Sequence, residues 1–249
     1  MYALLRLKEI IEGKLFYDSS KVGRSYIYVM QVADVAAAPL THTIARENAV
    51  TFLQPPFMTF DLTILMKKSG RSSMIRNIRD LSRQHTMKYG VVDGGSTKNF
   101  FRVTQTGVFP SMWSTMQASR STSYVRSIED GVRRVRQSTD SHPFAFIGEK
   151  YMLEYQARQP PCDLTTVNAH AQEYSGKYHL AVKKGLDAAT KRKLEEALEN
   201  LKNSGRLDAL YKKWWVERVQ CSRAPSSAVT SGLAVLVPIV VALFRVTGE

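Results

Sequence analysis

The sequence predicts an α/β fold in which strands and helices alternate along most of the chain. Its 249 residues are 44% hydrophobic and 23% charged, which provides enough apolar material for a packed core. Short apolar runs typical of strands are followed by amphipathic segments typical of helices. This alternation indicates layers of helices and sheets rather than a sandwich or a bundle, and the length suits one large domain or two lobes.

The first part of the chain is predicted to hold one helix and several extended segments. Apolar residues recur at helical spacing over 4–13, and Arg6 and Lys8 interrupt the apolar run that a signal peptide needs, so we expect an amphipathic helix. Pro55 and Pro56 exclude a helix around them. The extended segments are expected at 25–30, 32–38, 51–60 and 61–66.

A polar linker, Lys-Lys-Ser-Gly-Arg-Ser-Ser over 67–73, is the clearest boundary between segments of the chain. Beyond it, Asp187 is a suitable N-cap for a long helix that ends near Asn203, before Gly205. Strands are expected at 89–92, 144–147 and 178–182, and helices from 96 onward, over 128–136 and over 206–215.

The end of the chain is strongly apolar. Arg223 and Arg245 flank 21 uncharged residues, which are densely apolar from 232 to 244. A helix of that length would span about 32 Å, close to one hydrocarbon thickness. We therefore predict a transmembrane-like hydrophobic helix within 222–249, with a loosely docked tail as the alternative because Pro225 and Pro238 interrupt the segment.

The composition favours anionic partners and excludes several kinds of site. The net charge is +13, which suits nucleic acid, acidic membranes or carboxylate ligands. The arginine-rich stretches 71–83 and 133–136 lack interleaved aromatic residues, so we expect solvated helix faces and no nucleic-acid partner. Five scattered histidines show no metal-ligand spacing, so no metal or cofactor is expected. No nucleophile–base pair indicates an enzyme.

Two cysteines, Cys162 and Cys221, exclude a dense disulfide scaffold and a four-cysteine zinc site. A bridge between them would close a loop worth about 4 kcal/mol and would indicate an oxidising compartment. From the count alone, two separate thiols fit equally well.

The turn Asp-Gly-Gly-Ser-Thr over 93–97 joins a predicted strand to a predicted helix. Free backbone N–H groups and the helix dipole make such a start suitable for a carboxylate or a phosphate at Ser96 and Thr97. The turn lacks the Gly-Lys-Ser/Thr ending of a Walker loop. An ordinary capped helix is the alternative.

Two charged side chains could each bind a group of opposite charge. The guanidinium of Arg46 is a planar fork suited to a carboxylate, and the Thr41 hydroxyl and the Pro39 carbonyl precede it along the chain. Glu149 ends an apolar strand and could take an ammonium group. Surface salt bridges are the alternative for both charges.

The order of the motifs resembles the ligand-binding core of ionotropic glutamate receptors of the AMPA/kainate branch. The resemblance covers most of the chain and becomes clear at Ala-Asp-Val-Ala-Ala-Ala-Pro-Leu-Thr over 33–41. The other matching motifs lie at 46–47, 56–59, 89–90, 95–101, 112–113, 131–136, 144–146, 149, 162–164, 213–215 and 221.

The resemblance implies a two-lobe, periplasmic-binding-protein-like clamshell, with lobe 1 at 1–60 plus 178–221 and lobe 2 at 61–177. The α-carboxylate of the ligand would lie on the Arg46 guanidinium and on the N–H groups of Thr41 and Ser96. The side-chain carboxylate would lie at Ser96 and Thr97. The ligand ammonium would be held by three groups: the Pro39 carbonyl, the Thr41 hydroxyl and the Glu149 carboxylate.

The resemblance also implies a Cys162–Cys221 disulfide and a biological setting. The ligand would be L-glutamate or a similar amino acid, and closure of the clamshell would open a cation pore. The partners would be other receptor subunits, four in a receptor of this family. The ligand-binding part would be extracellular at the plasma membrane, postsynaptic in the family.

The chain departs from the family pattern in several places. The family has pore-forming segments after the position of Lys68, whereas here the linker runs directly on. The first strand of lobe 1 is missing, and Asp61 and His179 replace glycines expected at the lobe crossings. An incomplete gene model of a full receptor and a pore-less relative both fit. The alternative function is therefore a pore-less, soluble or membrane-tethered amino-acid-binding module.

Overall fold

The computed structural model describes residues 34–69, 72–217, 221 and 242–244. The helix expected at 4–13 and the strand expected at 25–30 lie outside these residues. The described residues form two compact units, each with its own sheet. Unit 1 holds 34–59, 177–217 and 242–244, and unit 2 holds 60–69, 72–176 and 221.

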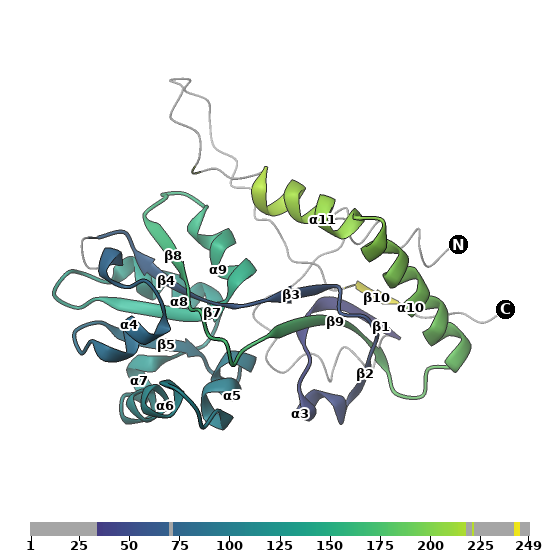
Figure 1. The fold of residues 1–249 in the computed structure, drawn as a ribbon, viewed down its shortest axis with the longest axis horizontal. Coiled ribbons are helices and arrows are strands. Elements are labelled where there is room, and N and C mark those ends of the chain that lie inside the picture. Colours follow the sequence, from purple (N-terminus) through teal and green to yellow (C-terminus); the bar gives the residue numbers. More distant parts are fainter. Residues whose placement is uncertain (1–33, 70–71, 218–220, 222–241, 245–249) are drawn as a thin grey trace, which may run out of the picture. The chain divides into compact units, whose positions relative to one another are not determined.

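Unit 1 is built on a sheet with the strand order β10-β1-β9-β2, in which β3 also pairs with β9 (Figure 1). Strand β9 pairs antiparallel with β1 and with β2. The strands are β1 (Val35–Thr41), β2 (Val50–Phe52), β3 (Met58–Phe60), β9 (Gly176–Lys183) and β10 (Ala242–Phe244).

The helices of unit 1 begin where the sequence places capping residues. Helix α10 (Ala188–Asn203) starts after Asp187, whose Oδ1 accepts a hydrogen bond from Thr190 N at 2.8 Å. Gly205 has a left-handed φ of 68°, and α11 (Arg206–Tyr211) follows it and continues into a π-helical turn, Lys212–Val216. The short helix α3 (Ile44–Glu47) follows β1. The predicted long helix and the segment after it are confirmed.

The apolar residues at the end of the chain differ from the expected helix. Ala242–Phe244 is the strand β10, which pairs antiparallel with Val35–Ala37 of β1. The expectation of a helix through 244 is wrong there, because β9 pairs with only one side of β1, and the N–H and C=O groups on its other side take Ala242–Phe244 as a strand partner. Residues 222–241 lie outside the described ones. Within the described part of the chain, no helix has the length and apolar character needed to cross a membrane.

The core of unit 1 lies on both faces of its sheet. One cluster joins the sheet to Leu194 and Leu198 of α10, and its other buried members are Val35, Leu53, Leu180 and Val182. A second cluster consists of Ala36, Leu40, Val50, Phe52 and Ala181. Alternate residues of β1 and β9 therefore face opposite clusters, as the pleat of a strand requires.

Unit 2 is built on a mixed sheet with the order β6-β5-β7-β4-β8 (Figure 1). Strand β5 runs parallel to β6 and β7, whereas β4 runs antiparallel to β7 and β8. The strands are β4 (Leu62–Lys67), β5 (Lys88–Val92), β6 (Tyr124–Val125), β7 (Phe144–Glu149) and β8 (Leu164–Asn168). The predicted α/β class is confirmed.

Helices of unit 2 cover its sheet, and two of them share one buried cluster with it. Val132 and Val135 of α8 and Leu153 of α9 pack with Phe146 of β7. Gly131 of α8 permits this contact, because a Cβ there would lie 2.6 Å from the Phe146 ring. The helices are α4 (Ile78–Arg83), α5 (Ser96–Val103), α6 (Phe109–Ala118), α7 (Arg120–Ser123), α8 (Ile128–Gln137) and α9 (Lys150–Ala157), with a 3₁₀ turn at Ser72–Met74.

Candidate functional site

Arg46 is held at the end of strand β1 by backbone and side-chain contacts. The Thr43 hydroxyl caps α3 and accepts a hydrogen bond from Arg46 N at 3.3 Å. The Arg46 Nη1 atom donates to the carbonyl oxygen of Thr41 at 2.7 Å. Thr41 itself is only 7% exposed. The sequence thus places a half-buried guanidinium beside the last residue of a central strand, where it can take a carboxylate.

Pro39 lies where the ladder between β1 and β9 is irregular. The pairing register shifts between Ala36 and Leu40, and it resumes as Leu40 opposite His179 and Thr41 opposite Tyr178. Proline has no N–H to give to a ladder, so an irregular stretch suits it. Its carbonyl group therefore precedes Thr41 in a part of β1 that departs from regular strand pairing.

The turn after β5 presents the start of helix α5. Gly94 has a φ of 72°, which a residue without a side chain adopts readily. Gly95 is the N-cap and supplies no side-chain cap, so the first N–H groups of α5 depend on other partners. Ser96 is half-buried and Thr97 is 6% exposed. The helix dipole adds positive potential at this end.

Glu149, the last residue of β7, lies at the start of α5. The Ser96 Oγ atom donates a hydrogen bond to Glu149 Oε1 at 2.9 Å, although 53 positions separate the two residues. The contact places the start of α5, which can bind an anion, next to a carboxylate that could hold an ammonium group. A ligand with both charges on neighbouring atoms fits such a pair.

An ion pair lies beside the same turn. Lys98 Nζ is 2.5 Å from Asp93 Oδ1, and it also lies 4.2 Å from the centre of the Tyr124 ring. The hydrogen bond from Lys98 lowers the pKa of the Asp93 carboxyl below its usual range. Asp93 is therefore ionised but paired with Lys98, and this pairing reduces its repulsion of an anion at the start of α5.

The six predicted ligand-binding residues thus fall into two groups. Unit 1 carries Pro39, Thr41 and Arg46, with Arg46 bonded to Thr41. Unit 2 carries the other three, Ser96, Thr97 and Glu149, with Ser96 bonded to Glu149. That one ligand engages both groups remains a prediction.

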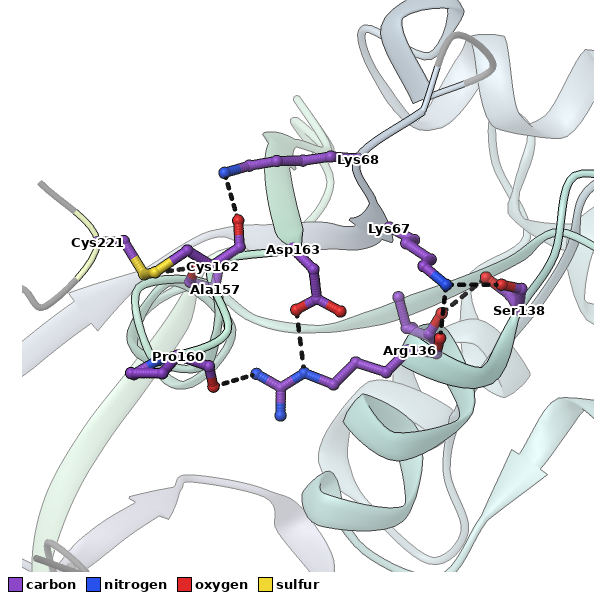
Figure 2. A network of polar contacts seen from close by, with 10 residues as sticks. Lys67, Lys68, Arg136, Ser138, Ala157, Pro160, Cys162, Asp163 and Cys221 are labelled. Atoms are coloured by element: carbon purple, nitrogen blue, oxygen red, sulfur yellow. Dashed lines mark hydrogen bonds and ion pairs between the residues drawn. A yellow bond between two sulfur atoms is a disulfide. The ribbon is translucent and has the colours of Figure 1, made fainter. Parts of the chain in front are cut away.

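Cys162 and Cys221 form a disulfide, as the family resemblance implies, with their Cα atoms 5.5 Å apart. The bridge lies within a polar network of unit 2 (Figure 2). Lys68 Nζ donates to the Cys162 carbonyl at 2.7 Å, and Lys68 N donates to the Asp163 carbonyl at 2.8 Å. The network therefore connects the end of β4 to the residues around the disulfide.

Arg136 corrects the expectation of a solvated arginine face on α8. Its Nε lies 3.2 Å from Asp163 Oδ1 and its Nη2 donates to the Pro160 carbonyl at 3.1 Å (Figure 2). Lys67 Nζ donates to the carbonyls of Arg136 and Ser138 at the end of the same helix, at 2.9 and 3.2 Å. Helical spacing cannot reveal these partners, because they lie far away in the sequence. Two lysines followed by serines are typical of a linker, and this pattern does not indicate that Lys67 bonds the last carbonyl groups of α8.

The comparisons with known proteins agree with this fold. Residues 30–217 match the family described as bacterial extracellular solute-binding proteins, family 3. The chain is 34% identical to Glutamate receptor 3 of Mus musculus over 170 residues, which are 68% of this chain and 18% of that protein. It is equally identical to Glutamate receptor 3 of Homo sapiens over 163 residues, 66% of this chain and 18% of that protein. The chain thus spans less than a fifth of the length of these relatives.

The matched residues include most of both units, with β1 to β9 and the helices that pack on their sheets, and leave out Cys221 and β10. They also include all six residues predicted to bind a ligand. The chain belongs to the bacterial extracellular solute-binding proteins, family 3, and carries a ligand-binding domain like that of ionotropic glutamate receptors.

Proposed function

We propose that this chain binds L-glutamate or a closely related amino acid through residues of both units. Two observations support the proposal: in unit 1 the Arg46 guanidinium is oriented by the Thr41 carbonyl, and in unit 2 Ser96 at the start of α5 contacts Glu149. A bidentate guanidinium suits the α-carboxylate, and the uncapped start of α5 suits a second carboxylate. Glu149 supplies the negative charge for the ammonium group.

Each group has a defined role in this proposal. The α-carboxylate lies on Arg46 and on the N–H groups of Thr41 and Ser96, and the side-chain carboxylate lies at Ser96 and Thr97. The ammonium group lies on Glu149, the Thr41 hydroxyl and the Pro39 carbonyl. Because contacts come from both units, ligand binding favours the arrangement in which both groups reach it, and this shift is the closure of the clamshell.

The ammonium role of Glu149 can be tested with two ligands. Glutarate has the two carboxylates of glutamate but no ammonium group, so the unmodified chain should bind glutamate more tightly. Glu149→Gln removes the charge with little change in shape and should weaken glutamate binding by about 30-fold, since a lost charged partner costs about 2 kcal/mol or more. Calorimetry should show a much smaller change for glutarate.

The matched control is Glu196→Gln, an exposed carboxylate on α10. It should leave both affinities unchanged. If Glu149→Gln weakened glutarate and glutamate binding equally, the ammonium assignment would be wrong.

Within a receptor, closure would act on the chain after Lys68 and near Cys221 and open a cation pore formed by several subunits. The relatives are named glutamate receptors, which supports this setting. The disulfide supports an oxidising, extracellular location for the binding domain.

A second function, amino-acid binding without a channel, is favoured by the segment after β4. Ser69 N donates to Ser72 Oγ at 3.0 Å and Ser72 Oγ donates to the Ser69 carbonyl at 2.8 Å, so Ser69 and Ser72 are bonded to each other at the position where receptors of this family have pore segments. Cells expressing this chain alone should then show glutamate binding at the surface or in the medium but no glutamate-gated current. A current from the chain alone would exclude this function.

A further inference from the structure

Strand β9 carries a histidine in the interior of unit 1. His179 is 2% exposed, and its Nδ1 lies 3.0 Å from the carbonyl oxygen of Leu53. A carbonyl only accepts hydrogen bonds, so Nδ1 carries the hydrogen and Nε2 is the unprotonated nitrogen. Among the described residues, no group lies within hydrogen-bonding distance of this buried Nε2. Nε2 is therefore the ring nitrogen that can accept a further proton, and it is buried without an acceptor for the N–H bond that would form.

A second histidine contacts the first. The rings of His42 and His179 meet edge to face with their centres 5.3 Å apart, and Phe52 lies 4.6 Å from His42 and 5.7 Å from His179. His42 Nε2 forms an ion pair with Glu47 Oε1 when the ring is protonated. His42 thus has a carboxylate partner, whereas the ring contacts of His179 are with His42 and Phe52.

We propose that His179, whose ring packs edge to face on that of His42, is a proton-sensing site that loosens the β1–β9 pairing on acidification and thereby releases the amino-acid ligand from Arg46. The first part stands on unit 1 alone, and the second part rests on the function proposed above. Protonation adds one proton to Nε2 of His179 and leaves every covalent bond unchanged.

The pKa of the His179 imidazole depends on the groups around it. Burial lowers the pKa of the imidazole below its usual range, the Leu53 carbonyl opposes this effect, and His42 and Lys177 add to it. Helix α3 contributes Arg46 as well as Glu47, which is half-exposed and paired with His42. From α10, Glu195 accepts a hydrogen bond from Gln54 N, one residue beyond Leu53.

The sign of the effect follows from the lowered pKa. The unfolded chain, with an ordinary histidine pKa of about 6.5, takes up the proton before the folded chain does. The contribution of neutral His179 to stability is therefore complete above that pH and is lost as the pH falls below it. The folded-to-unfolded ratio should fall by up to about tenfold per pH unit there.

The pairing between β1 and β9 transmits the change to the ligand site. Leu40 lies opposite His179 and Thr41 lies opposite Tyr178, so both partners are neighbours in the ladder. The Thr41 carbonyl is the acceptor that orients Arg46 Nη1 at 2.7 Å. A charge on His179 that separates the two strands therefore displaces the segment that carries Thr41 and Arg46 from its place beside β9.

Urea unfolding of the full chain between about pH 8 and pH 5.5 tests the site without any ligand. His179→Asn retains an amide donor for the Leu53 carbonyl but cannot take the proton, so it should lose the part of the pH dependence below about pH 6.5 that His179 causes. His179→Phe, which keeps the ring volume, should behave likewise. His85→Gln removes an exposed histidine in unit 2 and should keep the dependence. Equal pH dependence in the unmodified chain and both His179 variants would overturn the proposal.

Two further measurements test the proposal if the variants do not fold or do not bind glutamate. If the variants do not fold, the imidazole signals of the unmodified chain in NMR decide, because His179 should titrate below the exposed histidines; a midpoint at or above about 6.5 would overturn the site. Calorimetry should show glutamate affinity falling on acidification in the unmodified chain and not in His179→Asn. An equal fall in both would overturn the coupling to Arg46. If glutamate binds at no pH, the proposed function fails, and the unfolding comparison still decides the proton site.

Discussion

Arg46→Ala should lower the affinity for L-glutamate by about 30-fold to several thousand-fold, because truncating one partner of a buried, hydrogen-bonded charge pair costs about 2–5 kcal/mol. The loss includes the cost of leaving the ligand carboxylate unpaired in the site. Thr43 still caps α3 after the substitution through its bond to the backbone of residue 46, so the fold should persist. Calorimetry with L-glutamate, at the pH used for the unmodified chain, measures the effect.

Two variants sharpen this test. Arg46→Lys keeps the charge but loses the planar fork, so it should also bind weakly, since lysine cannot replace a bidentate guanidinium. Arg192→Ala removes an arginine on α10 that is 75% exposed and should bind glutamate like the unmodified chain. Unchanged affinity in Arg46→Ala would show that this residue does not hold the carboxylate.

Cys221→Ser should lower the free energy of unfolding by about 3–4 kcal/mol, because the disulfide closes a loop of 59 positions and restricts the unfolded chain. Lys68 and Asp163 keep their contacts around Cys162, so local structure in unit 2 should remain. The urea midpoint of the oxidised chain, compared with that of the variant, measures the loss.

The chain supplies its own controls for the disulfide. The reduced unmodified chain and the double variant Cys162→Ser, Cys221→Ser should match Cys221→Ser. An unfolding midpoint that is the same with and without reductant would contradict the expectation and would mean that the bridge adds nothing to stability.

Local chemistry was sufficient to predict many elements of the fold. Asp187 marks the start of α10 because its side chain satisfies an N–H of the first turn, and that bond depends only on residues three apart. The two glycines before Ser96 mark the strand-to-helix turn for a similar reason, since Gly94 needs a positive φ. Such signals depend on neighbours in sequence and survive in any tertiary context.

Elements that depend on distant partners were not predictable in this way. Helix α9 has only one buried residue, Leu153, so it lacks a clear apolar stripe. Ala242–Phe244 is apolar enough for a helix but is extended, because β1 offers it a strand partner more than 190 positions away in sequence, from Val35 to Phe244. Propensity over a short apolar run cannot decide between these outcomes.

The candidate site also has features that the sequence predicts and features that depend on distant partners. The residue types of Arg46, Ser96 and Glu149 only permit an amino-acid ligand, with surface salt bridges and an ordinary capped helix as the alternatives, and it was the family resemblance that selected these residues. The bond from Ser96 to Glu149 could not be derived from spacing, since 53 positions separate them. The contact between His42 and His179 likewise appears only when β1 and β9 are paired.

The central claim is that unit 1 and unit 2 hold one and the same ligand. A crystal structure of the chain with L-glutamate tests it most directly. The α-carboxylate should accept hydrogen bonds from the Arg46 guanidinium and from Ser96 N, each at about 2.9 Å, with Glu149 against the ammonium group. A glutamate bound by one unit only, with Arg46 and Ser96 facing separate solvent-filled surfaces, would contradict the account.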